Sequence, residues 1–294
     1  MIKKVWRWQV AFRQIKKMKI VLKKIFVICG LISIYCLMPG LSFSAEKSWK
    51  LLPSRTLFAP LIADLREPQT GFFTLVNKNR YAGAIGQSID LFQWKLSNKE
   101  RISWGVHGAA YALLDYGGRS FPMRANDWQY GTSISHSKKK FSQRLEFTHA
   151  SAHLGDSLTD ERNWIEYSRE YFRLILSYDY NDSMRFYGGG GAVVHTFPHV
   201  NPIFFQGGGE VFSSSKDFLS HPIRFYGAYD VKYKDEAGGA WNNSVQFGIQ
   251  WKPSRKQTRK ALRLGIHYFN GNNEFGQFYL EKDSYWGFGI YFDS

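Results

Sequence analysis

The chain has almost no cysteine. It contains two in 294 residues, Cys29 and Cys36, and both lie near the N-terminus. Disulfide frameworks, thiol catalysis and cysteine-ligated metal sites are therefore excluded from the remaining chain. Long apolar runs are also scarce, because no stretch after residue 45 is apolar enough to cross a bilayer as a helix. Helical periodicity is almost absent, which favours an all-β fold.

Acidic residues are missing from the N-terminus. The first 24 residues hold nine lysines and arginines and no acid, and the apolar run Ile25–Leu41 follows them. Small residues then precede a polar segment, an order typical of a secretory signal peptide. We expect an extension and signal over residues 1–44 with a cut after Ser44, and the alternative is an uncleaved anchor. Met18 competes with Met1 as the start of translation.

This N-terminus also accounts for most of the positive charge. The chain has 39 cations and 24 acids, so removing those nine leaves 30 cations against 24 acids. A surplus of that size is too small to indicate nucleic acid as a partner.

Short alternating segments fill the rest of the chain, and 17% of all residues are aromatic. About ten residues of alternation are followed by a turn cluster, which is typical of strands. We predict about twelve: Thr70–Asn77, Ala82–Leu96, Arg101–Leu114, Asp127–Ser137, Lys140–His153, Trp164–Tyr180, Met184–Thr196, Pro202–Phe212, Pro222–Lys234, Trp241–Lys252, Lys260–Asn270 and Ser284–Phe292. The pattern predicts an all-β transmembrane antiparallel β-barrel in a bacterial outer membrane. The barrel should span residues 70–294, after a periplasmic N-terminal segment at 45–69. A soluble β-sandwich is the alternative.

The connections and the last strand bear on orientation and assembly. Short predicted turns alternate with longer loops, so we expect the short turns to face the periplasm. The last strand, SYWGFGIYFDS, approximates the C-terminal pattern by which barrels are recognised for insertion. The expected partners are therefore outer-membrane lipids and the barrel-assembly machinery.

Two features predict how the wall and lumen are built. The glycine clusters Gly188–Gly191 and Gly207–Gly209 fall on neighbouring strands, which predicts a bent or thinned wall there. Arg169, Glu170 and Arg173 predict a charged cluster in the lumen, and hence a narrow or closed pore.

The stretch FTHASAHLGDS places His149, Ser151 and His153 two residues apart on one strand. Residues two apart share a face, and this row continues from Phe147 and Leu145, so it should face lipid. Polar groups facing lipid are costly unless they have partners. A lipid hydrolase needs its nucleophile near the lipid headgroups, where the ester bonds lie, and a porin has no such need. The alternative is that these residues mark where the strand leaves the membrane.

Four segments resemble a family of bacterial outer-membrane proteins known only as a domain of unknown function. They are LFAPLIADLREPQ (Leu57–Gln69), HASAHLGD (His149–Asp156), REYFRLILSY (Arg169–Tyr178) and the pair LRLGIHYFNG and GFGIYFD (Leu262–Gly271 and Gly287–Asp293). This resemblance implies a barrel of unassigned activity and names no substrate.

Residues 148–163 also resemble the active-site region of outer-membrane phospholipase A. That resemblance implies Ser151 as nucleophile, His149 as general base and Asn163 as the group that orients the base. The same pattern also resembles that of outer-membrane lipid A deacylases, in which the third member is a glutamate. In this chain Glu166 lies close to Asn163.

We expect three further side chains to support this site: His153, Asp156 and Glu166. His153 could support the loop or substitute as base. No metal site is assigned, and calcium is the one cofactor considered, because Asp156 and Asp160 supply the oxygen ligands it prefers. The sequence therefore predicts either a lipid acyl-ester hydrolase at the outer rim or a non-catalytic barrel.

Overall fold

The computed structural model describes residues 48–117, 121–158, 164–218, 221–252 and 260–293. Residues 1–44, which carry the predicted signal, lie outside that part. The strands are β1 (Ser48–Leu51), β2 (Thr70–Leu75), β3 (Arg80–Ser97), β4 (Glu100–Asp115), β5 (Met123–Lys138), β6 (Phe141–Leu154), β7 (Tyr167–Asn181), β8 (Met184–Phe197), β9 (Ile203–Phe212), β10 (Lys216–Phe218), β11 (His221–Lys234), β12 (Ala240–Trp251), β13 (Ala261–Asn272) and β14 (Lys282–Asp293). Four short 3₁₀ turns complete the regular structure: η1 (Val76–Lys78), η2 (Asp156–Leu158), η3 (Asp235–Ala237) and η4 (Gly276–Phe278). None of the described helices has the length and hydrophobicity needed to cross a bilayer.

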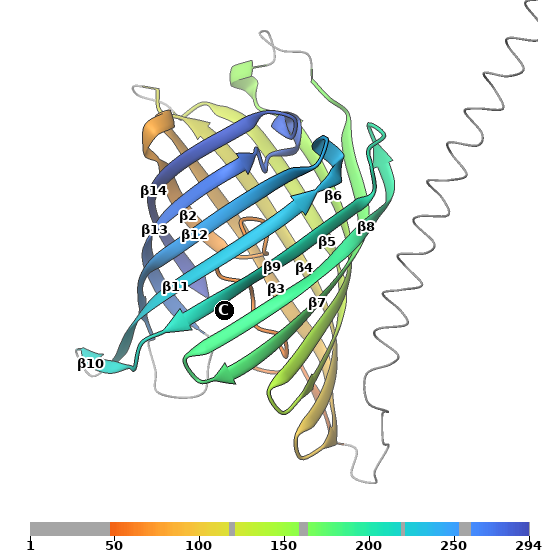
Figure 1. Cartoon of the computed structure of the whole chain (residues 1–294), viewed down its shortest axis with the longest axis vertical. Coiled ribbons are helices and arrows are strands. Elements are labelled where there is room, and N and C mark those ends of the chain that lie inside the picture. The colour runs from red at the N-terminus through yellow and green to blue at the C-terminus, as the bar shows by residue number, and fades with distance from the viewer. Residues whose placement is uncertain (1–47, 118–120, 159–163, 219–220, 253–259, 294) are drawn as a thin grey trace, which may run out of the picture.

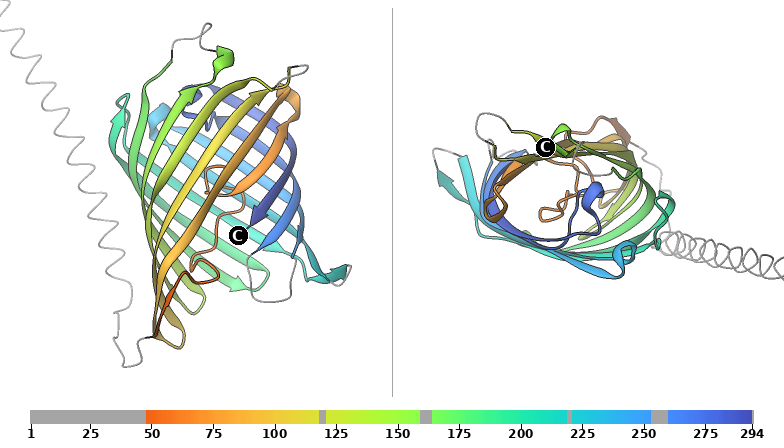
Figure 2. Two further views of the ribbon diagram at one scale, coloured as in Figure 1. Left: turned by 180° about the vertical axis from the view of Figure 1, so that it is seen from behind. Right: turned by 90° about the horizontal axis from the view of Figure 1, so that it is seen from above.

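Twelve of the fourteen described strands close into a ring (Figures 1 and 2). Sequence neighbours pair antiparallel, and β9 pairs directly with β11. The ring closes where β2 pairs with β14, with Phe72 opposite Ile290. Outside the ring, β1 adds to β3 and β10 adds to β11. The predicted antiparallel barrel of about twelve strands is confirmed, and β1 and β10 are additional to the predicted strands.

Side chains alternate between the outside of the barrel and its lumen. In β4, Trp104 and Val106 face outward and are exposed, whereas Ser103 and His107 are buried in the lumen. A barrel in hydrocarbon requires this arrangement, because lipid-facing and lumen-facing residues alternate along every strand.

The two glycine clusters lie side by side, as predicted, with Gly188 opposite Gly207. One of these glycines makes room inside the barrel. A Cβ at Gly208 would collide with the ring of Tyr187. The Tyr187 side chain instead passes over Gly208 on the lumen side of β9, and its hydroxyl donates a hydrogen bond to Asp230 Oδ2 at 2.8 Å. Glycine here therefore permits a close approach between wall and lumen side chain.

Residues Leu57–Gln69, called the plug below, lie inside the barrel (Figure 2). Phe58 and Leu61 are fully buried and pack against Ile175 and Tyr187 of the wall. This part of the N-terminal segment predicted at 45–69 therefore lies in the lumen. The physical reason is that its carboxylates have partners there, since Arg144, Arg173 and Lys232 of the wall pair with Asp64 and Glu67.

The two ends of the barrel differ. At the turn end, short turns join Ser97 to Glu100, Lys138 to Phe141 and Asn181 to Met184. The last strand also ends there, and the chain enters the lumen from that end, since Leu52 N–H donates to the Leu91 carbonyl at 2.9 Å. The plug therefore enters and leaves through the same opening.

At the opposite, loop end, the connections fold over the barrel. Residues 273–281 turn inward, and Phe278 of η4 is buried. It belongs to an apolar cluster with Leu113, Leu158 and Phe269. Gln277 fixes the loop by donating Nε2 hydrogen bonds to the carbonyls of Ala152 at 2.7 Å and Ile165 at 2.6 Å.

Candidate functional site

The predicted outward row of β6 is present. Arg144, Glu146 and Thr148 are buried in the lumen, and His149 and Ser151 therefore lie on the outer face in line with Phe147. On that face His149 lies opposite Tyr130 of β5 and Glu170 of β7. Ser151 lies opposite Trp128 and Ser168. The outward orientation of His149 and Ser151 predicted from the sequence is thus correct. Which residues lie beside them is set by the pairing of β6 with β5 and β7.

Glu170 is the acidic partner of His149. The Oε1 atom of Glu170 lies 3.5 Å from His149 Nδ1, and its Oε2 lies 3.7 Å from His195 Nδ1. The ring of Tyr130 lies 5.0 Å from the His149 ring, centroid to centroid. Glu170 therefore sits between two imidazoles on the outside of the wall.

The sequence prediction misplaced Glu170. It grouped Glu170 with Arg169 and Arg173 in the lumen, and the structure buries both arginines there while Glu170 faces outward. The physical reason is the two-residue repeat of a strand. That repeat puts Glu170 on the same face as Phe172, and it was the signal that could have identified Glu170 as the neighbour of His149.

The other predicted site residues are dispersed. Asn163 lies outside the described residues, and so does Asp160. His153 is exposed near the end of β6, and Asp156 is exposed in η2. Glu166 is exposed just before β7 begins. Within the described ranges no group of three or more potential ligands could hold a metal ion.

The outer-face group combines a carboxylate, an imidazole and a hydroxyl. A carboxylate at Nδ1 favours the tautomer in which Nε2 of His149 accepts a proton. Ser151 supplies a hydroxyl on the same face. Two residues along a strand span about 6.6 Å, so the Ser151 hydroxyl and the imidazole meet only when both rotamers lean toward each other.

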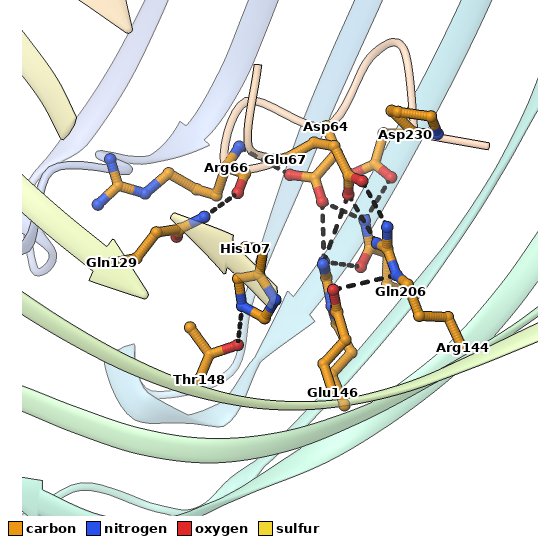
Figure 3. Close-up of polar contacts among 12 residues, drawn as sticks. Asp64, Arg66, Glu67, His107, Gln129, Arg144, Glu146, Thr148, Gln206 and Asp230 are labelled. Carbon is orange, nitrogen blue, oxygen red and sulfur yellow. Dashed lines mark hydrogen bonds and ion pairs between the residues drawn. The ribbon is translucent and has the colours of Figure 1, made fainter. Parts of the chain in front are cut away.

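A second polar group, called the lumen network, joins the plug to the wall (Figure 3). Its members are Asp64, Glu67, Arg144, Glu146, Arg173, Gln206, Asp230 and Lys232. Both plug carboxylates, Asp64 and Glu67, are 0% exposed. Buried charges are costly unless they are paired and hydrogen-bonded.

Glu67 binds the wall through two parallel hydrogen bonds. Arg144 donates from Nη1 to Oε1 at 2.7 Å and from Nη2 to Oε2 at 2.8 Å. This fork geometry is the strong form of an arginine–carboxylate pair. Arg144 Nε also lies 3.0 Å from Glu146 Oε1, at an angle that makes no hydrogen bond.

Asp64 accepts from three wall side chains. Arg173 Nη1 and Gln206 Nε2 each donate to Oδ2 at 2.9 Å, and Lys232 donates to Oδ1. Burial by itself would raise the pKa of Asp64, but the ammonium of Lys232 and the guanidinium of Arg173 outweigh it and hold that pKa well below its usual value. Asp64 is therefore ionised at neutral pH and anchored at mid-lumen.

Arg66 fixes the plug toward the loop end. Its side chain pairs with Asp127, and its carbonyl accepts hydrogen bonds from Tyr111 at 2.9 Å and Gln129 at 2.8 Å. Asp127 also accepts the Gly276 N–H at 2.9 Å, which links the inward-turned loop to the plug.

Glu274 adds a further ionic contact in the same loop. It accepts from Lys234 Nζ at 2.8 Å. Burial opposes ionisation of Glu274, but Lys234 and Lys232 outweigh it and lower its pKa to about 2.

Residues 44–293 match a family described as "Protein of unknown function (DUF1207)". The chain belongs to this family. No curated protein matches the sequence. A solved structure named "KdgM porin" is similar with a TM-score of 0.44 and 10% identity, covering 76% of this chain and 97% of that one. A likeness this distant carries no functional inference.

The segments that resemble the family now have places in the fold. The first is the plug, which supplies Asp64 and Glu67. The third lies on β7 and supplies Arg173, one of their partners. The second carries His149 and Ser151 on the outer face. Two of the four segments, the first and the third, therefore supply residues that connect the plug to the wall.

Proposed function

We propose that the protein is a bacterial outer-membrane barrel whose lumen is sealed, so that it does not act as an open diffusion pore. The observation that carries this is the bidentate Glu67–Arg144 pair at 2.7 and 2.8 Å, because it fastens the plug across the lumen. Cavity sizes support the proposal. A cavity of about 830 Å³ lies at the turn end, whereas two cavities nearer the loop end measure about 30 and 100 Å³.

The outer surface supports the membrane location. Outward side chains such as Phe225, Phe247 and Trp286 are large, apolar and exposed on the barrel wall. In water such a surface would promote aggregation, whereas in a bilayer it is the expected lipid-facing band. Outer-membrane lipids and the barrel-assembly machinery are accordingly the proposed partners, with the turn end toward the periplasm.

Planar-bilayer recording tests the seal. We expect no steady conductance from the parent protein. The double variant Asp64→Asn/Glu67→Gln should show current steps, because the plug loses both of its buried charges. Asp182→Asn, in an exposed turn, is the matched control and should behave like the parent. Steady ion flow through the parent would contradict the proposal whether or not the variants fold.

A second candidate is lipid acyl-ester hydrolysis on the outer wall, favoured by the 3.5 Å contact between His149 and Glu170. Ser151 Oγ would attack the ester carbonyl carbon while His149 takes the hydroxyl proton. That proton would pass to the leaving alcohol, and water would then release the fatty acid from Ser151. Glu170 would orient His149, the role that the resemblance gives to Asn163.

This second candidate is tested with phospholipid and refolded protein, with and without calcium. Ser151→Ala and His149→Ala should abolish fatty-acid release, and Glu170→Gln should reduce it. Ser168→Ala is the matched control, because Ser168 lies directly opposite Ser151 on the neighbouring strand. An inactive parent, or a Ser151→Ala variant as active as the parent, would remove the hydrolase candidate and leave the sealed barrel unaffected.

A further inference from the structure

A cavity of about 360 Å³ opens at the turn end, between the start of the plug and the ends of the wall strands, and shares part of its lining with the larger cavity there. This volume lies within the range of small-molecule sites. Five cations line it, against one carboxylate. The cations are Arg55, Lys99, Arg101, Lys139 and Arg185, and the carboxylate is Asp179.

Within the described part of the chain, four of those cations have no acidic partner. Among ion pairs between described residues, none involves Arg55, Lys99, Arg101 or Lys139, whereas Arg185 pairs with Glu210 at 2.9 Å. Like charges that converge on one cavity repel one another. An arrangement of this kind raises the local concentration of anions and lowers the free energy of binding one.

Arg185 also lines this cavity and is held in one position. It is 6% exposed, and its two terminal nitrogens are held by the Ala59 and Pro60 carbonyls and by Glu210. Its Nε atom is buried and has no hydrogen-bond partner. A buried guanidinium nitrogen without an acceptor is costly. Arg185 therefore keeps a fixed positive charge at the lining of the cavity.

We propose that this cavity binds a small soluble oxyanion that carries two or more negative charges, such as a phosphate ester or a polycarboxylate. Ser137 and Ser142 line the same cavity and supply neutral donors. Ser137 and Ser142 lie opposite each other, and Arg101 lies opposite Ser137, on the lumen side of the strands. The ligand therefore comes from the aqueous space at the turn end and is not a lipid headgroup.

The probe is inorganic pyrophosphate, titrated calorimetrically into the full chain folded in detergent at low ionic strength. We expect saturable binding at one site, and no binding of glucose. The double variant Arg101→Gln/Lys139→Gln should weaken binding by about tenfold or more, because each charged hydrogen bond contributes strongly. Lys78→Gln, at the loop end, is the matched control and should bind like the parent.

Asp179→Asn keeps the test decisive if the double variant folds poorly. Removing the one carboxylate of the lining should tighten pyrophosphate binding by about threefold, and a folding defect cannot mimic a gain. Unchanged affinity in both variants, or no saturable binding by the parent, would overturn the proposal. Displacement of pyrophosphate by phosphatidylglycerol in the same detergent would overturn the assignment to a soluble anion.

Discussion

The pair between Glu67 and Arg144 offers the sharpest test of how the plug is held. The perturbation is a double-mutant cycle of Glu67→Gln, Arg144→Met and the combined variant. Arg144→Met leaves the Glu67 carboxylate buried with a single remaining cation, Arg173, at 3.5 Å. Glu67→Gln keeps the shape of the side chain and removes its charge.

The magnitude follows from burial and geometry. Glu67 and Arg144 are both buried and share two short hydrogen bonds. Breaking such a pair by removing one partner costs about 3–5 kcal/mol, because the other charge stays buried without compensation. The combined variant removes both charges, so its loss should be smaller than the sum of the single losses. We expect a coupling of about 2 kcal/mol, within the range for residues in contact.

The assay is urea unfolding in detergent, followed by tryptophan fluorescence. Arg80→Gln provides a more exposed comparison, because Arg80 and Asp115 pair at 3.3 Å and are 26% and 27% exposed. Its loss should cost less than about 1 kcal/mol. A Glu67–Arg144 coupling below about 0.5 kcal/mol, the level at which independent sites add, would refute the reasoning that this pair fastens the plug.

Three other predictions concern the wall, the loop and the lipid face. Gly208→Val should displace Tyr187 and cost about 1–3 kcal/mol in urea unfolding, whereas Gly207→Ala, whose Cβ would have ordinary contacts, should be tolerated; equal losses would contradict this account of the wall. The pKa of Glu274 is lowered in the folded state to about 2 from 4.5, so its contribution of about 3 kcal/mol is present above pH 4.5 and is lost as the pH falls toward 2. The free energy of unfolding should fall between pH 5 and pH 2.5 in the parent and fall less in Glu274→Gln. Equal losses in the two proteins would exclude this contribution of Glu274. Phe247→Arg should reduce the yield of protein refolded into vesicles, since a cation near the bilayer midplane costs about 2–4 kcal/mol, and Phe247→Leu should not; equal yields would indicate that Phe247 does not face lipid.

The sequence predicted the strands well because their signal is local. Alternation of apolar and polar residues over about ten positions located twelve strands, and it also placed His149 and Ser151 on the outer face. The same local pattern shows why Gly188–Gly191 and Gly207–Gly209 were expected to be neighbours. Successive antiparallel strands pair, so their positions along the chain determine which segments meet.

The prediction was weaker where contacts join distant segments. Asp64 and Glu67 lie in the segment that the sequence predicts to be periplasmic, and no nearby residue marks them as lumen side chains. Their partners lie far along the chain, on other strands. Glu170 differs for another reason. Its charge groups it with Arg169 and Arg173, whereas the two-residue repeat of the strand places it on the opposite face from them.

The sequence alone determined an alternating β chain, without cysteine after residue 36, that has an apolar outside and a polar inside. It could do so because strand sidedness repeats every two residues and needs no knowledge of the fold. Only the tertiary structure decided what fills the barrel and which side chains meet. Closing the ring brings Arg144, Arg173 and Lys232 to face one interior. Charges buried in that interior need partners within hydrogen-bond distance, and the plug carboxylates supply them.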